Sequence, residues 1–170
     1  QNGMSSLPQP VRLYYDYTVF RKERPQRGRY REFNQLGVEI FGDESAKSDY
    51  LSIMSAWEIF SRLGLKKLTV FANSIGCHAC RPKFISKLYK YYKDKLDKIC
   101  PDCHSRYENN PLRLLDCKND ACQSIASNAP IFLDHLCKYC KDHFQNTLEY
   151  LDYFNISYDL DPKLVRGLDY

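Results

Sequence analysis

The chain has 170 residues, of which 44% are hydrophobic and 27% are charged, and its net charge is +4. This length and composition suffice for one or two compact units with a core, and they exclude an intrinsically disordered chain. The sequence shows no apolar run of about 18 residues for a membrane span and no basic-then-apolar leader, so we expect a cytoplasmic protein. The small positive charge favours an anionic partner without naming one.

The first part of the chain predicts a hairpin, a helix and a short strand. Two runs rich in Tyr, Val, Phe and Ile, 11–23 and 29–41, flank a turn that contains Pro25, which is typical of antiparallel strands. Between 46 and 63, apolar residues recur at three- and four-residue steps, as on one face of an amphipathic helix. Residues 67–72 then predict a strand.

The second part of the chain predicts further helices and short strands. Pro82 begins a helix, because proline suits the first helical position. Residues 111–116 predict a short strand and 141–154 a long helix with a periodic apolar face. Two closing strands are expected at 156–161 and 164–170.

The order of these elements indicates an α+β fold. Pieces based on β-sheet lie at both ends of the chain, and a cysteine-rich α/β insertion lies between them. All eight cysteines fall between Cys77 and Cys140. We therefore expect sheet-based pieces at 1–72 and 156–170, with the insertion at 73–155.

The second strand of the hairpin has two chemically different faces. Alternate residues of a strand share a face, so Leu36, Val38 and Ile40 form an apolar stripe. The opposite face carries Arg29, Arg31, Phe33, Gln35, Gly37 and Glu39. Arginines bind phosphate oxygens with two parallel hydrogen bonds, and a bare glycine lets a ligand approach the backbone. A solvated lattice of salt bridges on an exposed sheet would explain the same charges.

Five stretches resemble one enzyme family. "FRKERPQRGRYREFNQLGVEIFG" (20–42) resembles motif 2 of class II aminoacyl-tRNA synthetases in its histidyl-tRNA synthetase form. "LVRGLDY" (164–170) resembles the start of that family's histidine-specific motif, and the cysteine-bearing stretches between them resemble the insertion domain of bacterial members. The resemblance covers nearly the whole chain in the family's order. It implies part of an antiparallel-sheet catalytic domain with an inserted domain.

The resemblance implies an ATP site on the hairpin. Arg21 matches the arginine that binds the α-phosphate of ATP and the histidine carboxylate. Glu23 matches the residue that binds the adenine amino group. Arg29 matches the residue for the terminal phosphates, and Phe33 matches the ring on which adenine stacks.

The resemblance also implies a histidine site. Gln35 and Glu39 match the pair that recognises the imidazole, and Arg21 reaches the carboxylate. Arg166 matches the second catalytic arginine, although a structural arginine at a strand start is the alternative. Tyr170 belongs to the histidine-binding motif.

The implied reaction joins histidine to tRNA in two steps. ATP, as its Mg complex, activates histidine to histidyl-adenylate, and the histidyl group then passes to tRNA(His). Neither step needs a protein nucleophile, because positioning and positive charge carry such transfers. We expect the full-length parent to be a homodimer. Motif 1, motif 3 and the anticodon-binding domain are expected outside these 170 residues, so the isolated segment should be inactive.

Two other functions fit parts of the sequence. One is a catalytically silent synthetase paralogue, like the regulatory subunit of ATP phosphoribosyltransferase. Arg21, Glu23, Arg166 and the cysteine-rich insertion argue against it. The other is a zinc-stabilised RNA-binding module whose hairpin is only a scaffold. The family usually carries a bulkier apolar pair where Thr18 and Val19 stand here.

The cysteine spacings predict zinc. Four cysteine thiolates complete a tetrahedral zinc shell, and two ligands three positions apart come from one turn. Reduced thiols without metal and disulfides remain alternatives, and spacing leaves the pairing open. His78 and His104 are expected on the surface. The candidate ligands are Cys77, Cys80, Cys100, Cys103, Cys117, Cys122, Cys137 and Cys140.

The segment 81–98 is basic, with seven Lys or Arg residues interleaved with tyrosines. A solvated lysine face is one reading of this pattern. If the resemblance holds, this segment meets the acceptor stem of tRNA, where cations contact phosphates. The candidate tRNA-binding residues are Arg24, Gln26, Arg27, Arg81, Lys83, Lys87 and Lys90.

Overall fold

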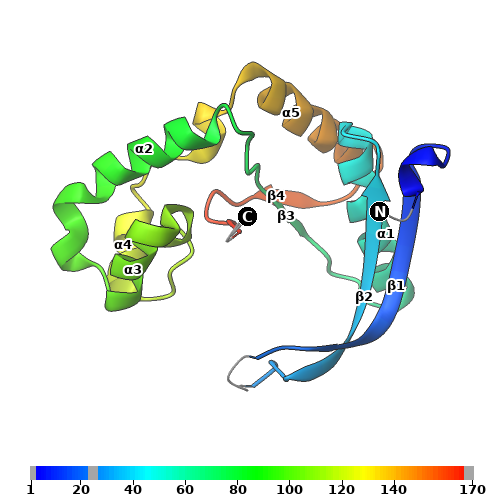
Figure 1. Cartoon of the computed structure of the whole chain (residues 1–170), viewed down its shortest axis with the longest axis horizontal. Helices are drawn as coiled ribbons and strands as arrows, with labels where there is room; N and C mark the ends of the chain where they lie inside the picture. Colours follow the sequence, from blue (N-terminus) through cyan, green and yellow to red (C-terminus); the bar gives the residue numbers. More distant parts are fainter. Residues whose placement is uncertain (1–2, 23–26, 167–170) are drawn as a thin grey trace. The chain divides into compact units, whose positions relative to one another are not determined.

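The structure is a computed structural model that describes residues 3–22 and 27–166, and the chain divides into two compact units, 1–68 and 69–170. Helices and strands are mixed, and an antiparallel strand pair is present, so the expected α+β class is confirmed. Within the described residues, no helix is both long enough and apolar enough to cross a membrane. Each unit has its own arrangement of elements (Figure 1).

The first unit is a long hairpin followed by a helix, as the sequence predicts. After a short 3-10 turn at Met4–Ser6, β1 (Val11–Phe20) pairs antiparallel with β2 (Glu32–Phe41), and Figure 1 shows the two strands twisting together. The helix α1 (Ala46–Arg62) follows. Asp43 holds its first turn, since Oδ2 accepts from Ser48 Oγ at 2.7 Å and Oδ1 accepts from the Ser45 amide at 2.9 Å.

The apolar stripe of β2 lies on the α1 side of the hairpin but is only partly covered. Leu36 and Val38 line a hollow of about 240 Å³ together with Ala56, Ile59 and Phe60 of α1. Leu36 nevertheless remains 52% exposed and Val38 40% exposed. One helix therefore covers only part of the stripe that the alternation predicts for a core.

The second unit begins and ends on a parallel strand pair and is otherwise helical. Strand β3 (Val70–Ala72) pairs in register with β4 (Tyr158–Leu160), which lies beside it in Figure 1. Between these strands no further strand occurs, and residues 73–157 are all described. The elements in order are α2 (Arg81–Tyr92), η2 (Lys93–Lys98), α3 (Pro101–Asn109), η3 (Pro111–Leu114), α4 (Asp120–Ala126), η4 (Phe132–His135) and α5 (Lys138–Tyr153).

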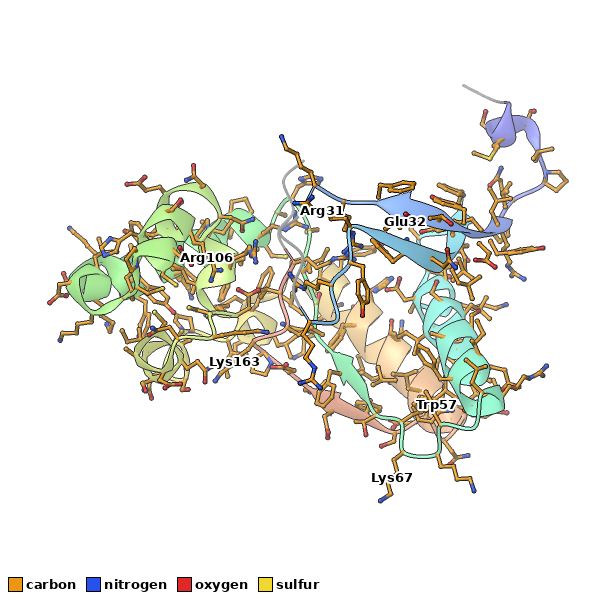
Figure 2. The ribbon with its side chains drawn as sticks, turned by 90° about the horizontal axis from the view of Figure 1, so that it is seen from below. Arg31, Glu32, Trp57, Lys67, Arg106 and Lys163 are labelled. Carbon is orange, nitrogen blue, oxygen red and sulfur yellow. The ribbon has the colours of Figure 1, made fainter. Side chains whose placement is uncertain are left out.

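One predicted strand is wrong, and a second is not found in the part of it that the structure describes. Residues 111–114 form the 3-10 helix η3, because Leu112, Leu114 and Leu115 are all buried and such a pattern does not alternate. The guanidinium of Arg106 on α3, labelled in Figure 2, donates to the Arg113 carbonyl at 3.4 Å and ties η3 to α3. In the second case, residues 164–166 are not in a strand, and 167–170 lie outside the described residues.

Two short helices are missing from the sequence prediction, and one helix starts earlier than predicted. Pro101 stands at the beginning of α3, a position that proline favours. The side chain of Asn119 caps α4 by accepting from the amides of Ala121 and Cys122. Helix α5 begins at Lys138 rather than at Lys141 and ends before Asn155, whose φ of 54° stops it as expected.

The core of the second unit follows one face of α2. Phe84, Leu88 and Tyr92 recur every fourth residue and are at most 1% exposed. The Phe84 ring stacks on Phe132 with the centroids 4.5 Å apart. Five cysteines belong to the same buried cluster, which joins η3 and α4 to α2. The cysteines therefore form part of the core of this unit, together with its aliphatic and aromatic side chains.

Candidate functional site

The register of the hairpin places the predicted polar residues on one face. Directly opposed residues of an antiparallel pair share a face, and the observed pairs are Val19–Phe33, Tyr17–Gln35, Tyr15–Gly37 and Leu13–Glu39. Phe33, Gln35 and Gly37 are half-buried, whereas Glu39 is exposed. The structure therefore brings the candidate ATP and histidine residues of β2 into one row, which four residues of β1, two tyrosines and two aliphatic residues, face across the strand pair.

Arg21 and Phe33 are in direct contact on this face. The guanidinium carbon lies 4.5 Å from the centroid of the Phe33 ring, within the range of a cation–π interaction. The Arg21 amide donates to the Arg31 carbonyl at 2.8 Å, which continues the strand pairing beyond β1. A cation and an aromatic platform thus stand together, and this pair suits a ligand that combines a planar ring with a phosphate.

The Tyr15 ring occupies the space over Gly37 in which a ligand was expected to approach the backbone. A Cβ built on Gly37 would overlap the Tyr15 ring, so only glycine allows this ring to lie on β2. The Gln35 amide Nε2 donates to Tyr15 Oη at 2.7 Å. The Gln35 side chain is thereby oriented, and its Oε1 is available as an acceptor for a ligand N–H. The expectation of an open gap at Gly37 is wrong in this structure.

Sequence reasoning missed Tyr15. Its position opposite Gly37 follows from the strand pairing, which depends on where the turn lies. The available signal was the Gly37 position itself, because a glycine within a strand often marks a side chain or backbone that approaches closely. Tyr17 stacks near Tyr15 with the ring centroids 4.7 Å apart, and this contact helps to hold the phenol in place.

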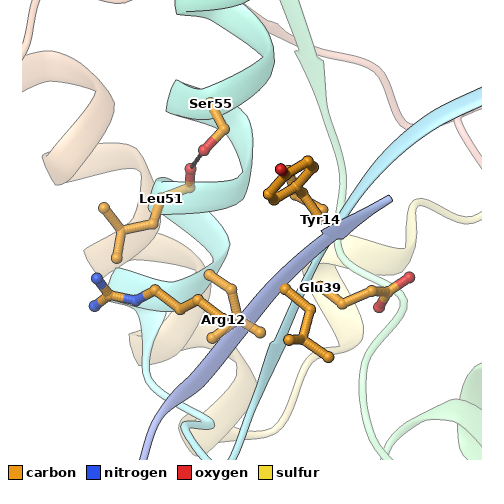
Figure 3. A pocket seen from close by; sticks show the side chains of 8 residues that line it. Arg12, Tyr14, Glu39, Leu51 and Ser55 are labelled. Carbon is orange, nitrogen blue, oxygen red and sulfur yellow. Dashed lines mark hydrogen bonds between the residues drawn. The ribbon is translucent and has the colours of Figure 1, made fainter. Parts of the chain in front are cut away.

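Glu39 points away from the α1 side of the hairpin. A hollow of about 270 Å³ lies on that side, lined in part by Arg12, Leu51 and Ser55. In Figure 3, the side chains of Arg12 and Glu39 extend to opposite sides of the hairpin, as strand alternation requires. Glu39 is itself among the residues that line this hollow, but its carboxylate extends to the side of the hairpin opposite Arg12, which is the face that carries Gln35.

The structure describes only some of the remaining candidate binding residues on the hairpin and near residue 170. Arg27 and Arg29 are exposed beside the turn. Arg166 belongs to the second unit and follows Val165, which packs at the edge of the buried cluster. Four candidates lie outside the described residues, namely Glu23, Arg24, Gln26 and Tyr170.

The basic residues of α2 have different surroundings. Lys83, Lys87 and Lys90 are exposed and lie four and three positions apart, so they form one stripe along the helix, here called the lysine stripe. Arg81 instead binds the preceding loop, donating from Nε to the Ile75 carbonyl at 3.0 Å and from Nη2 to the Gly76 carbonyl at 3.2 Å. Lys95 lies over the Tyr91 ring, 4.0 Å from its centroid.

The structure decides which cysteines lie together. The base group consists of Cys77, Cys80, Cys137 and Cys140, and the outer group consists of Cys100, Cys103, Cys117 and Cys122. Within each group, all Sγ atoms lie within 4.8 Å of one another. His78 and His104 belong to neither group and are exposed, as expected.

The sulfur spacing fits a tetrahedral metal. A Zn–S bond of about 2.3 Å puts the sulfurs of a tetrahedron about 3.8 Å apart. In the base group, Cys77 Sγ lies 3.7 Å from both Cys80 Sγ and Cys137 Sγ, and Cys80 Sγ lies 3.9 Å from Cys140 Sγ. In the outer group, Cys100 and Cys117 are 3.8 Å apart. A disulfide needs about 2.05 Å, and all eight cysteines are free thiols.

Backbone amides point at the sulfurs of the base group. The Cys77 amide donates to Cys80 Sγ at 3.2 Å, and the Ala79 amide donates to Cys77 Sγ at 3.4 Å. The amides of Ala79 and Cys80 are the main cause that lowers the pKa of the Cys77 thiol to about 6. Burial raises the pKa of Cys140 in the same group. Four thiolates together repel one another, and a bound divalent cation would remove that conflict.

The outer group shows the same features and is more deeply buried. The amide of Cys100 donates to Cys122 Sγ at 3.2 Å, and the pKa of Cys100 is lowered mainly by its backbone hydrogen bond with Cys103. Burial raises the pKa of Cys103 and of Cys122. The Tyr92 hydroxyl is buried with no hydrogen-bond partner among the described residues; its pKa is raised first by burial, then by Tyr91 and Cys103. A buried donor near charged sulfurs suits a metal–thiolate centre.

Comparison with known proteins gives consistent matches. The family described as Histidyl-tRNA synthetase matches residues 2–79. The histidine–tRNA ligases of Desulforamulus reducens and Acetivibrio thermocellus are 48% and 46% identical to the chain over 170 residues, and the chain spans 41% of the length of each. The crystal structure of apo S. aureus histidyl-tRNA synthetase matches 98% of this chain and 38% of its own, with a TM-score of 0.72 and 34% identity.

Proposed function

We infer that this chain, which is related over its whole length to an internal part of histidyl-tRNA synthetases, acts as a segment of a histidine–tRNA ligase. The observation that carries this inference is the row of Arg21, Phe33, Gln35 and Glu39 on one face of the hairpin. The reaction is the ATP-dependent activation of histidine to histidyl-adenylate and its transfer to tRNA(His). The chain spans about 40% of its relatives' length, so other segments supply the rest of the site.

The hairpin residues bind ATP and hold the α-phosphate. The Arg21 guanidinium lies over the Phe33 ring, and its N–H groups can make paired hydrogen bonds to phosphate and carboxylate oxygens. Phe33 offers its face to adenine, Glu23 binds the adenine amino group, and Arg29 binds the terminal phosphates. The charge that develops on the α-phosphate during attack is stabilised by Arg21 and by Arg166.

Gln35 and Glu39 recognise the histidine side chain. The Tyr15 hydroxyl already accepts one Gln35 amide hydrogen, so Gln35 presents its carbonyl oxygen to an imidazole N–H. Glu39 supplies a negative charge that favours the imidazole as a donor. Arg166 and Tyr170 are the other residues proposed to bind histidine. Tyr15 acts as a positioning residue, because it touches Gln35 rather than the reacting atoms.

The lysine stripe of α2 contacts the phosphates of tRNA. Three exposed ammonium groups on one helical face form a continuous cationic track, and backbone contacts of this kind do not depend on base identity. Arg24, Gln26 and Arg27 are the remaining residues proposed to bind tRNA. Arg81 contributes less, because its guanidinium already binds two backbone carbonyls.

The cysteine groups bind zinc, with one ion in each group. Their sulfur spacing, their amide donors and the absence of disulfides support this assignment. Zinc in a closed four-sulfur shell has no open coordination position for a substrate, so its contribution is structural. ATP enters as its Mg complex, and the full-length protein acts as a homodimer.

The division into domains follows from these roles. Residues 1–72 and 156–170 belong to the catalytic domain, and 73–155 form the insertion that meets the acceptor stem. The parallel pairing of β3 with β4 supports this division, because the chain that follows the insertion comes back beside the strand that precedes it.

Histidine-dependent ATP–pyrophosphate exchange tests the proposal. We expect the full-length protein to catalyse the exchange, and Arg21→Ala to lower its rate at least 100-fold, the effect of losing about 3 kcal/mol of transition-state stabilisation. Arg62→Ala is the matched control, because Arg62 forms an exposed ion pair with Glu58 on α1. A full-length protein that binds tRNA but never exchanges pyrophosphate would favour the silent paralogue or the RNA-binding module.

A further inference from the structure

The base group and the outer group lie at the two ends of α2. Cys80 of the base group directly precedes the helix, and Tyr92, its last residue, is the one whose hydroxyl interacts electrostatically with Cys103, Cys117 and Cys122 of the outer group. The twelve residues of α2 make about 18 Å of helix at 1.5 Å per residue. The helix that carries the lysine stripe is therefore anchored by one cysteine group at each end.

The base group joins parts of the chain that are far apart in sequence. Cys77 and Cys137 are 60 positions apart, yet their sulfurs are 3.7 Å apart. Cys77 and Cys80 come shortly after β3, whereas Cys137 and Cys140 begin α5, which leads into β4. The chain thus passes the base group after β3, runs through residues 81–136, and meets the base group again before α5 and β4.

Apolar packing across this base is thin. The buried cluster takes only Cys140 from α5, since the other buried residues of that helix, Thr147 and Leu151, lie outside the cluster. The apolar link on this side is Phe132 of η4, which stacks on Phe84 of α2 with the ring centroids 4.5 Å apart, and Leu136 packs against the same cluster. Beside this contact, the four sulfurs directly join the start of α2 to the start of α5.

We propose that the base group binds a zinc ion that clasps the two ends of the helical insertion and fixes the direction of the lysine stripe relative to β3 and β4. The outer zinc has a different role and completes the small core formed by α3, η3 and α4. Small units with little apolar core commonly depend on such metal centres. The effect on tRNA rests on the proposed function, whereas the clasp itself does not.

The two roles predict different consequences for matched double variants of the full-length protein. Cys137→Ser with Cys140→Ser removes two ligands of the base group, and Cys117→Ser with Cys122→Ser removes two ligands of the outer group. Zinc per chain, amide hydrogen exchange along 81–153 and affinity for tRNA(His) are measured for each. The base variant should retain one zinc, exchange faster in the first turn of α5 and keep the protection of α3. Its tRNA affinity should fall about tenfold or more.

The outer variant should also retain one zinc, but it should lose protection throughout 101–126. The single variant Cys137→His should keep two zinc ions and nearly normal exchange, because a histidine nitrogen is also a good zinc ligand. If the base variant does not fold, stepwise chelation of the unsubstituted protein replaces it. Release of one ion with loosening confined to the first turn of α5 would then support the clasp.

The clasp is refuted if the base variant still binds two zinc ions, or if it loses one without faster exchange in α5. It is also refuted if chelation releases both ions together with global unfolding. Adenylate formation by the unsubstituted protein is a separate measurement. Its absence would overturn the proposed ligase function, while zinc counts and hydrogen exchange would still decide the clasp.

Discussion

Replacing Gly37 by alanine should disturb histidine recognition through Tyr15. The added Cβ would overlap the Tyr15 ring, and the contacting atoms are at the far end of that side chain, so the ring would swing away rather than the backbone move. This movement breaks the hydrogen bond from Gln35 Nε2 to Tyr15 Oη, now 2.7 Å long, and the ring contact with Tyr17 at 4.7 Å.

The expected magnitude follows from these two contacts. A neutral hydrogen bond contributes about 1 kcal/mol and an aromatic pair about 0.5–1.5 kcal/mol, so the hairpin should lose roughly 2 kcal/mol of stability. For binding, losing the Gln35 orientation should raise KM for histidine about five- to tenfold, since about 1.4 kcal/mol corresponds to a factor of ten. KM for ATP should change little.

The assay is pyrophosphate exchange by the full-length protein at varied histidine, with Tyr15→Phe, Tyr15→Ala and the double variant Gly37→Ala, Tyr15→Ala alongside. Tyr15→Phe keeps the ring but removes the acceptor, so it should raise KM for histidine without lowering the melting temperature much. In the double variant the clash is gone, and the two effects should be strongly non-additive. Gly37→Ala with normal KM and melting temperature, or strict additivity in the cycle, would refute the role of Tyr15.

Three further predictions follow from the other candidate sites. Arg166→Ala should lower histidyl-adenylate formation by about 100-fold with an unchanged melting temperature, because it removes a charge aimed at the α-phosphate; a rate near that of the unsubstituted enzyme would remove Arg166 from the mechanism. Protein purified under reducing conditions should contain two zinc ions per chain, and chelation should lower its melting temperature; eight titratable thiols with no zinc would contradict this. Alanine at Lys83, Lys87 and Lys90 together should weaken tRNA binding and flatten its dependence on salt, whereas Lys95→Ala should not, because Lys95 lies over the Tyr91 ring.

Several features of this protein could be predicted from the sequence because they depend on neighbouring residues. The alternation in 11–23 and 29–41 predicted β1 and β2, and the apolar period in 46–63 predicted α1, with errors of a few residues at the ends. The division of β2 into an apolar and a polar face follows from the same alternation. Motif resemblance then suggested roles for the polar face, and the comparisons support the same family.

Only the tertiary structure decided how distant residues combine. The spacing of the eight cysteines could not show that Cys77 shares a group with Cys137, because these residues are 60 positions apart and the path of the chain between them decides it. The sequence likewise left Gly37 as an open gap, whereas the strand register brings the Tyr15 ring onto it. Burial of consecutive leucines turned 111–114 into a 3-10 helix against its local strand pattern. Local patterns are set by propensity and periodicity, but pairing, register and burial are set by contacts that form only when the whole chain packs.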